Sequence, residues 1–381
     1  MSVAIDYTSG AFAATKAQSV GTITGSDVDL SSGQYFEYTP AADTTFTFSN
    51  APASGTAAGF ALAVTGANVT SGYDLANASY DSVSFSVAAQ ESLSAGVTFK
   101  LDGTKMYVIG ELSDRIHEYN LSTAWDISTA AIFQNVSVAA QETTPQGLFF
   151  SPDGMHLYII GEGGRDVNQY SVGTAWDVST ISFVRVLNTS PQEFTPQGLF
   201  FSPDGIYLYV IGRAAPQDVN QYTLSSAWDI STASFTRGFS VSGQDTSPQD
   251  VFFAPTGLKM YVIGRTGDDV NEYSLSTAWD ISTASYIQNF SVAAQDINPT
   301  GLFFKADGSK MYMVGYSTNA VYQYSTTGTS APATFNYPTS VDWPSGTAPD
   351  APAVGETDVL VFYTEDGGTT YYGFQAGDAM A

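Results

Sequence analysis

The sequence predicts an all-β protein whose central part is a five-bladed β-propeller. The first observation is a Trp-Asp-(Ile/Val)-Ser-Thr motif that occurs four times, 51, 52 and 51 residues apart, at Trp125, Trp176, Trp228 and Trp279. The second is a Gln-acid pair that occurs five times, at Gln90-Glu91, Gln141-Glu142, Gln192-Glu193, Gln244-Asp245 and Gln295-Asp296. A fixed period near 50 residues indicates a repeat architecture, in which each copy is one supersecondary unit.

Each copy contains four strand-like runs, as the stretch from Gln141 to Ser190 illustrates. An apolar run over 147–150 ends at a Pro-Asp-Gly turn, and a second run covers 157–160. Two alternating runs follow, over 167–171 and 182–186. Alternation with a period of two residues, broken by turn residues, is typical of strands. Four antiparallel strands per copy is the pattern of a propeller blade, and nothing in it favours helices.

The fifth copy indicates how the ring closes. It stops after Tyr324, without the tryptophan motif and the fourth strand. A spare fourth strand lies upstream, because residues 83–90 match residues 135–141 and 289–295. We therefore expect the N-terminal strand to complete the last blade, which removes an open sheet edge. The propeller is predicted over residues 80–326.

The flanking segments predict a second β-module. Residues 1–20 form a small, polar N-terminal arm, whereas residues 21–72 and 330–381 contain short alternating runs. A closed ring brings its own first and last strands side by side, so it can be inserted into a loop of another domain. We expect 21–72 and 330–381 to form one split β-sandwich-like module with the propeller inserted in it. The alternative is two small independent domains, each with few strands.

Composition excludes several classes of function. The 381 residues carry a formal charge of -25, with no basic patch for phosphates, so nucleic acid is not an expected partner. The absence of cysteine removes disulfides. No apolar run reaches the length of a membrane span, and the first residues lack the features of a signal peptide. The chain is therefore expected to be made in the cytoplasm and not inserted in a membrane.

The flanking module carries a resemblance. Segments 44–55, 340–349 and 358–373, with Asp29-Leu-Ser-Ser-Gly, resemble the β-rich modules of tailed-phage tail fibres and other virion surface proteins. The blades resemble the Ser-Pro-Asp-Gly propeller repeats of many bacterial, marine and phage proteins. The resemblance implies a structural protein of the virion surface, a tail fibre, receptor-binding tip or capsid decoration, with the propeller displayed outward and the β-module attached to other virion proteins. It implies no catalytic residues.

The same resemblance implies assembly and a ligand. Phage fibres are often trimers, so a homo-oligomer is expected, although no heptad or collagen-like stretch fixes the number of chains. A glycan of the host surface is the expected ligand of a receptor-binding propeller.

The five acids of the Gln-acid pairs are a candidate cation site. They precede the first strand of each blade and would lie on one face of the propeller: Glu91, Glu142, Glu193, Asp245 and Asp296. A ring of carboxylates could hold a cation such as calcium, which prefers oxygen ligands. The alternative, favoured because every blade carries the feature, is that each acid accepts hydrogen bonds from loop backbone N–H groups.

The loop between the second and third strands differs most from copy to copy, so a specific site could lie there. Arg213, Arg265 and Tyr316 are its candidates for contact with a glycan or a partner protein, against ordinary surface variation. The tryptophans are expected to pack between blades, with stacking on carbohydrate as the alternative, and the aspartates that follow them to form Asx-turns.

Enzyme chemistry is not predicted. His117 and His156 are the only histidines, and neither has a nucleophile in its sequence context. A glycosidase needs two acids in different environments, whereas the paired acids repeat equally in every blade. The sequence therefore predicts a protein that is not an enzyme. The alternatives to the virion protein are a free carbohydrate-binding lectin and, after it, a glycosidase.

Overall fold

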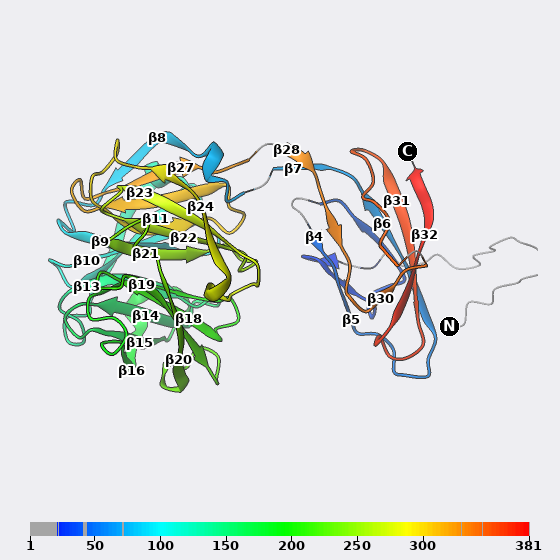
Figure 1. The fold of residues 1–381 in the computed structure, drawn as a ribbon, viewed down its shortest axis with the longest axis horizontal. Helices are drawn as coiled ribbons and strands as arrows, with labels where there is room; N and C mark the ends of the chain where they lie inside the picture. Colours follow the sequence, from blue (N-terminus) through cyan, green and yellow to red (C-terminus); the bar gives the residue numbers. More distant parts are fainter. Residues whose placement is uncertain are drawn as a thin grey trace, which may run out of the picture. The chain divides into compact units, whose positions relative to one another are not determined.

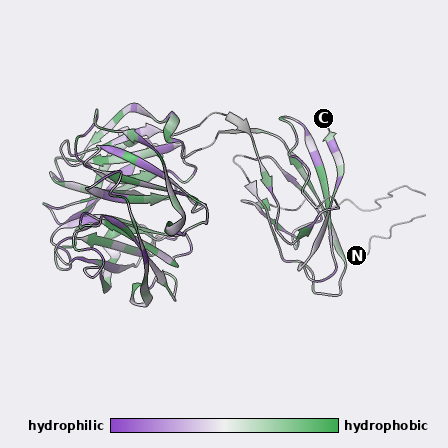
Figure 2. Ribbon diagram, in the orientation of Figure 1, coloured by the Kyte–Doolittle hydropathy of each residue, from purple (hydrophilic) through white to green (hydrophobic). Residues whose placement is uncertain are grey.

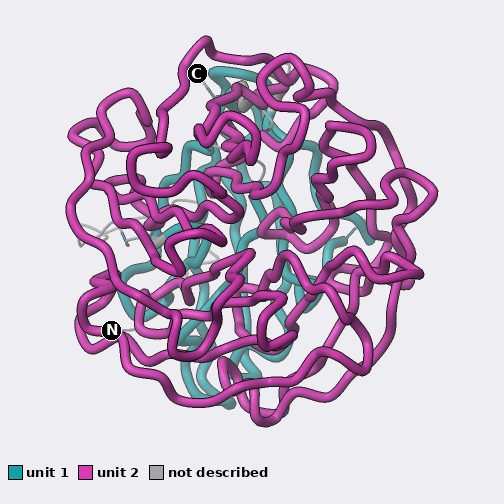
Figure 3. The backbone as a smooth tube through the Cα atoms, turned by 90° about the vertical axis from the view of Figure 1, so that its left-hand side faces the viewer, with its two compact units in different colours: residues 1–71, 329–381 teal, residues 72–328 magenta. Residues whose placement is uncertain are grey.

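The computed structural model describes residues 21, 23–40, 44–70, 72–328, 330–344 and 346–380. The predicted arm over residues 1–20 lies outside these residues. The chain divides into two compact units, which Figures 1 and 3 distinguish: unit 1 is Met1–Ser71 with Thr329–Ala381, and unit 2 is Gly72–Gly328. Unit 2 is thus inserted into unit 1. Unit 2 begins before the predicted start at residue 80 and ends just after the predicted end at residue 326.

Unit 2 consists of five four-stranded antiparallel sheets, the blades of a propeller (Figure 1). Blade one is β9 (Ser94–Phe99), β10 (Lys105–Gly110), β11 (Arg115–Leu121) and β12 (Ala130–Ser137). Blade two is β13 (Pro145–Phe150), β14 (His156–Gly161), β15 (Asp166–Val172) and β16 (Ile181–Asn188). Blade three is β17 (Pro196–Phe201), β18 (Tyr207–Gly212), β19 (Asp218–Leu224) and β20 (Ala233–Ser240). Blade four is β21 (Pro248–Phe253), β22 (Lys259–Gly264), β23 (Asp269–Leu275) and β24 (Ala284–Ser291).

Blade five closes the ring. It contains β25 (Pro299–Phe304), β26 (Lys310–Gly315), β27 (Ala320–Ser325) and, from the start of the unit, β8 (Ser79–Ser86). Strand β8 pairs antiparallel with β27, with Ala320 opposite Ser86 and Tyr324 opposite Tyr80. The prediction of a five-bladed propeller closed by an N-terminal strand is confirmed.

The strands carry the hydrophobic residues of the blades (Figure 2), and aromatic side chains join neighbouring blades. A buried tyrosine in each second strand donates its hydroxyl hydrogen to a main-chain carbonyl of the next blade, over 2.5 to 2.7 Å. The donor–acceptor pairs are Tyr107–Trp176, Tyr158–Trp228, Tyr209–Trp279, Tyr261–Tyr73 and Tyr312–Trp125. The five bonds run once around the ring. The rings of Trp125 and Trp228 pack against Tyr312 and Tyr158 of the preceding blade, with centroids 6.3 and 6.5 Å apart, so these tryptophans pack between blades, as predicted.

The turn after each tryptophan also follows the prediction. The aspartate that follows caps a short 3-10 helix by accepting a hydrogen bond from the backbone N–H two residues on, as Asp126 does from Ser128 at 3.0 Å. These helices are η1 (Leu75–Asn77), η2 (Ile127–Thr129), η3 (Val178–Thr180), η4 (Ile230–Thr232) and η5 (Ile281–Thr283). In blade five Tyr73 and Asp74 take the place of the Trp-Asp pair.

Unit 1 is built around a curled five-stranded sheet of order β3-β6-β31-β32-β30. Its strands are β3 (Tyr35–Tyr38), β6 (Ala58–Thr65), β30 (Val341–Asp342), β31 (Thr357–Thr364) and β32 (Tyr371–Met380). The smaller sheets contain β1 (Ile23–Thr24), β2 (Asp27–Asp29) and β5 (Thr47–Ser49), then β4 (Thr44–Thr45) with β29 (Phe335–Asn336), and β7 (Asn68–Thr70) with β28 (Ser330–Pro332).

An aromatic core joins these sheets. Phe36, Phe46, Phe60 and Phe362 are buried in it together. Strand β6, from before the propeller, pairs with β31, from after it, with Leu62 opposite Leu360. The two flanking segments therefore form one sandwich-like module, which excludes two independent domains. No helix in the described part of the chain is long and apolar enough to cross a membrane.

Candidate functional site

The first strands of the five blades lie side by side around the centre of the propeller, and four of them carry glycine at the third position. These glycines are Gly96, Gly147, Gly198 and Gly301. A Cβ atom on any of them would come within 3.0 Å of a carbonyl oxygen of the next blade, so close packing of the backbones requires glycine. In blade four the same position is Asp250. One carboxyl group therefore breaks the fivefold pattern at the centre of the ring.

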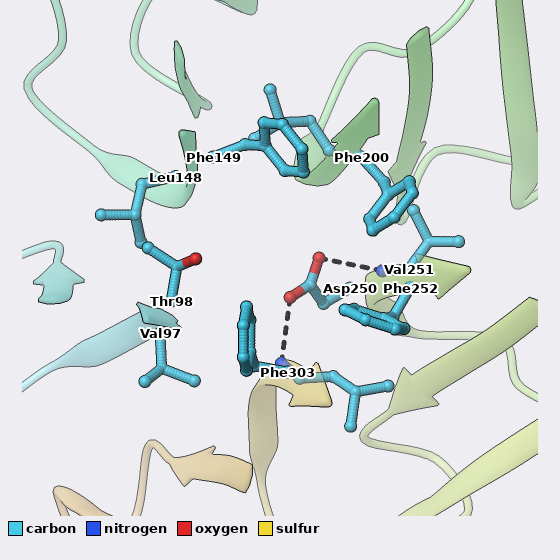
Figure 4. Close-up of a pocket in the computed structure, with 11 residues that line it drawn as sticks. Val97, Thr98, Leu148, Phe149, Phe200, Asp250, Val251, Phe252 and Phe303 are labelled. Carbon is cyan, nitrogen blue, oxygen red and sulfur yellow. Dashed lines mark hydrogen bonds between the residues drawn. The ribbon is translucent and has the colours of Figure 1, made fainter. Parts of the chain in front are cut away.

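Asp250 extends into a small cavity at the centre of the ring (Figure 4). Its Oδ1 accepts a hydrogen bond from the backbone N–H of Val251 at 2.9 Å, and its Oδ2 accepts one from Leu302 of blade five at 3.0 Å. The cavity has a volume of about 30 Å³, enough for one or two water molecules. Aromatic rings make up much of its wall: Phe149, Phe200, Phe252 and Phe303.

This environment changes the acidity of Asp250. Burial among apolar groups raises the pKa of its carboxyl to about 7, against the opposing effect of the two N–H donors. Near neutral pH the carboxyl therefore changes readily between its protonated and ionised forms. A carboxyl group with such a pKa can act as a general base or acid.

Five side chains occupy the same position in the five blades, directly after the second strand, and we call this set the mouth ring. This mouth ring is Glu111, Glu162, Arg213, Arg265 and Tyr316. All five are half-buried. Electrostatic effects on the pKa of Arg265, in blade four, come from Glu111 of blade one and Arg213 of blade three, which is consistent with a ring around one axis. The three residues predicted from loop variation, Arg213, Arg265 and Tyr316, are thus brought close together.

The side chains of the mouth ring differ in their hydrogen-bond and ion-pair partners. Arg213 forms an ion pair with Glu162, which also accepts a hydrogen bond from Gln197 Nε2 at 2.6 Å. Glu111 accepts one from Gln146 Nε2 at 3.1 Å. Arg265 lies over the ring of Tyr316, with 4.5 Å between the guanidinium carbon and the ring centroid. Burial, followed by the nearby charge of Arg213, lowers the pKa of Arg265.

The five acids of the Gln-acid pairs serve their own blades. Each is buried and accepts hydrogen bonds from backbone N–H groups of two loops. Glu142 accepts three, from Thr144, Gly163 and Gly164, at 2.7 to 3.0 Å. Among the described residues, no group of three or more His, Cys, Asp or Glu side chains could hold a metal ion. The geometry therefore favours the backbone role over a calcium ring of Glu91, Glu142, Glu193, Asp245 and Asp296.

Replacing Glu142 by alanine is expected to lower the free energy of unfolding by about 2–4 kcal/mol, because three backbone N–H groups lose a charged acceptor. Adding calcium chloride or EDTA should leave the melting temperature of the wild type unchanged. The measurement is thermal and urea unfolding of the full chain, with exposed Asp342→Ala as the control. A calcium-dependent rise in melting temperature that disappears in Glu142→Ala would restore the cation-ring hypothesis.

His117 differs from its expected context. Its Nε2 lies 3.0 Å from Ser113 Oγ, so a hydroxyl does lie next to this histidine, contrary to the sequence prediction. The same hydroxyl donates to Glu91 at 2.6 Å. In a catalytic triad the acid binds the histidine and not the serine. His117 Nδ1 is buried and has no partner among the described residues, so this group does not form a triad.

Comparison with known proteins gives one family likeness. Residues 113–279, less than half of the chain, match the family model described as Lactonase, 7-bladed beta-propeller. The matched region contains Asp250, Arg213 and Arg265 and covers parts of four blades of this five-bladed ring. No curated protein matches the chain.

Two solved structures are similar at a low level. A protein from Lactobacillus plantarum has 20% sequence identity and a TM-score of 0.37, covering 52% of this chain and 55% of that one. This chain thus spans about half of that protein. A putative 6-phosphogluconolactonase from Bacteroides uniformis ATCC 8492 has 13% identity and a TM-score of 0.39, covering 74% of this chain and 85% of that one. Neither likeness defines a function.

The Lactonase match overturns the prediction that the chain is not an enzyme. That prediction compared only the acids that repeat equally in all blades. Asp250 is the acid that does not repeat, and a comparison of Pro-Gln-Asp with Pro-Gln-Gly in the first strands would have revealed it. The virion-surface location, the homo-oligomer and the host-glycan ligand stay predictions, because none of the comparisons bears on them.

Proposed function

We propose that the propeller is a hydrolase that opens a small cyclic ester at the central cavity that contains Asp250. The observation that carries the proposal is Asp250, a single carboxyl with a pKa of about 7 where four blades have glycine. The likeness to the Lactonase family model over residues 113–279 supports an ester of the lactone class. The mouth ring supplies the polar groups that would orient such a molecule at the propeller.

The chemistry requires only water as a second reactant. Asp250 in its ionised form takes a proton from a water molecule as the water oxygen bonds to the carbonyl carbon. The bond between that carbon and the ring oxygen then breaks, and Asp250 returns the proton to the leaving oxygen. The product is an open-chain hydroxy acid, so atoms and charge balance. The cavity is large enough for the attacking water, and its aromatic walls limit the contact of Asp250 with bulk solvent.

Replacing Asp250 by glycine, the residue of the other four blades, is expected to reduce lactone hydrolysis by about 10²–10⁴-fold. The assay follows acid release from a panel of γ- and δ-lactones at pH 7.5, corrected for spontaneous opening. Asp342→Asn, an exposed residue of unit 1, is the matched control. Thermal unfolding confirms that each variant is folded. Absence of hydrolysis across the panel, or full activity in Asp250→Gly, would refute the proposal.

A further inference from the structure

We propose that the mouth ring binds an oxyanion, a carboxylate or a phosphate group, through a two-pronged contact with Arg265. This inference deepens the proposed function in one respect, since it assigns the anion to a part of the substrate remote from the ester. The binding site itself is argued from the contacts of Arg265 and its neighbours.

Arg265 has two hydrogen-bond donors without an acceptor. Its Nε and Nη2 atoms are buried, and neither has a partner among the described residues. These two nitrogens lie on one edge of the guanidinium group and direct their N–H bonds in parallel, which matches two oxygens of a carboxylate or phosphate. A buried donor left unpaired costs free energy, so the arrangement favours a ligand that supplies the acceptors.

Tyr316 contacts Arg265 without accepting a hydrogen bond from Nε or Nη2. The guanidinium carbon of Arg265 lies over the phenol ring of Tyr316, 4.5 Å from the ring centroid. Such a cation–π contact orients the guanidinium group without taking up its N–H donors. The contact therefore holds Arg265 in place for an in-plane acceptor.

The carboxylates around Arg265 are occupied elsewhere. Glu111 accepts a hydrogen bond from Gln146, and Glu162 pairs with Arg213. Asp296 accepts backbone N–H bonds from Asn298 and Thr318, at 2.6 and 2.8 Å. Of the two mouth-ring arginines, Arg213 has an ion pair, whereas no carboxylate of the described residues lies within ion-pair distance of Arg265.

The neighbouring blades also lack a glutamine side chain that could contact Arg265 or Tyr316. In blades two and three, Gln146 and Gln197 contact mouth-ring residues of the preceding blade. At the corresponding positions of blades five and one, the side chains are the shorter Thr300 and Ala95. The Thr300 hydroxyl donates to the carbonyl oxygens of Ser94 and Val314. The glutamine side chain that contacts the mouth ring from blades two and three is therefore absent next to Arg265 and Tyr316.

The test measures binding, not turnover, by isothermal titration of the full chain with inorganic phosphate and with D-gluconate. The wild type should bind at least one of them, and its affinity should fall as sodium chloride is added. The stronger ligand distinguishes a phosphate from a carboxylate site. Arg265→Gln should weaken binding by about tenfold or more. Arg265→Lys keeps the positive charge but loses the two parallel N–H donors, so it should also bind more weakly than the wild type.

The control is Arg185→Gln, which removes an arginine paired with Asp229 outside the mouth ring. It should bind like the wild type. No binding of either anion, or equal binding by Arg265→Gln or Arg265→Lys, would overturn the inference. Anion binding that depends on Arg265 without any lactone hydrolysis would refute the hydrolase alone. Hydrolysis that is indifferent to Arg265, with no anion binding, would refute the anion site alone.

Discussion

Replacing Trp176 by alanine is expected to lower the free energy of unfolding by about 3–5 kcal/mol, the usual cost of removing a buried aromatic ring. The side chain is 7% exposed, and its ring centroid lies 5.0 Å from that of Phe150. The ring also covers Gly154 of the Asp-Gly turn. Truncation would therefore leave a cavity between the blade and its turn, and the positive φ of 63° at this position remains unfavourable for alanine.

The control for this prediction comes from blade five, in which Tyr73 has the equivalent place and a φ of 61°. Trp176→Tyr should lose less than half as much stability as Trp176→Ala. The measurement is the midpoint of urea unfolding for the full chain, followed by tryptophan fluorescence and by circular dichroism. Equal losses in the two variants would show that the ring does not serve packing. Non-coincident transitions of the two probes would indicate that the units unfold separately.

The architecture was predictable because packing requires the same residue types at the same positions in every blade. The tryptophan motif, the Gln-acid pair and the apolar first strand each satisfy a contact that all five blades must make. The same holds for blade five, which lacks the tryptophan motif, because Tyr73-Asp74-Leu75 has the geometry of Trp-Asp-Ile there. The paired acids illustrate the same principle, because Glu142 repeats for the sake of loop backbone groups and not for a ligand.

The site was predictable only in part, because function lies in departures from the repeat. Arg213, Arg265 and Tyr316 are recognisable as differences between copies, but their meeting depends on the closure of the ring. Asp250 was missed because a single substitution in an apolar strand changes neither the period nor the alternation. Its unusual pKa follows from the convergence of four phenyl rings, each from a different blade, which no local pattern encodes.

Replacing Asp250 by asparagine is expected to stabilise the protein increasingly as the pH rises from 5 to 8. The pKa of Asp250 is about 7 in the folded chain, against an ordinary value of 3.8. Between these values the folded chain binds more protons than the unfolded chain, so the contribution of Asp250 to stability falls as pH rises and is constant above about 7. Each pKa unit corresponds to about 1.4 kcal/mol.

With allowance for the partial exposure of Asp250, we expect the advantage of the asparagine variant to grow by about 2 kcal/mol between pH 5 and pH 8. Urea unfolding of the wild type and Asp250→Asn at both pH values measures it. The other charges of this acidic chain affect both proteins alike, so the difference isolates residue 250. An advantage that is the same at pH 5 and pH 8 would mean that Asp250 titrates normally. It would then be ionised throughout this range and too weak a base for the proposed proton transfer.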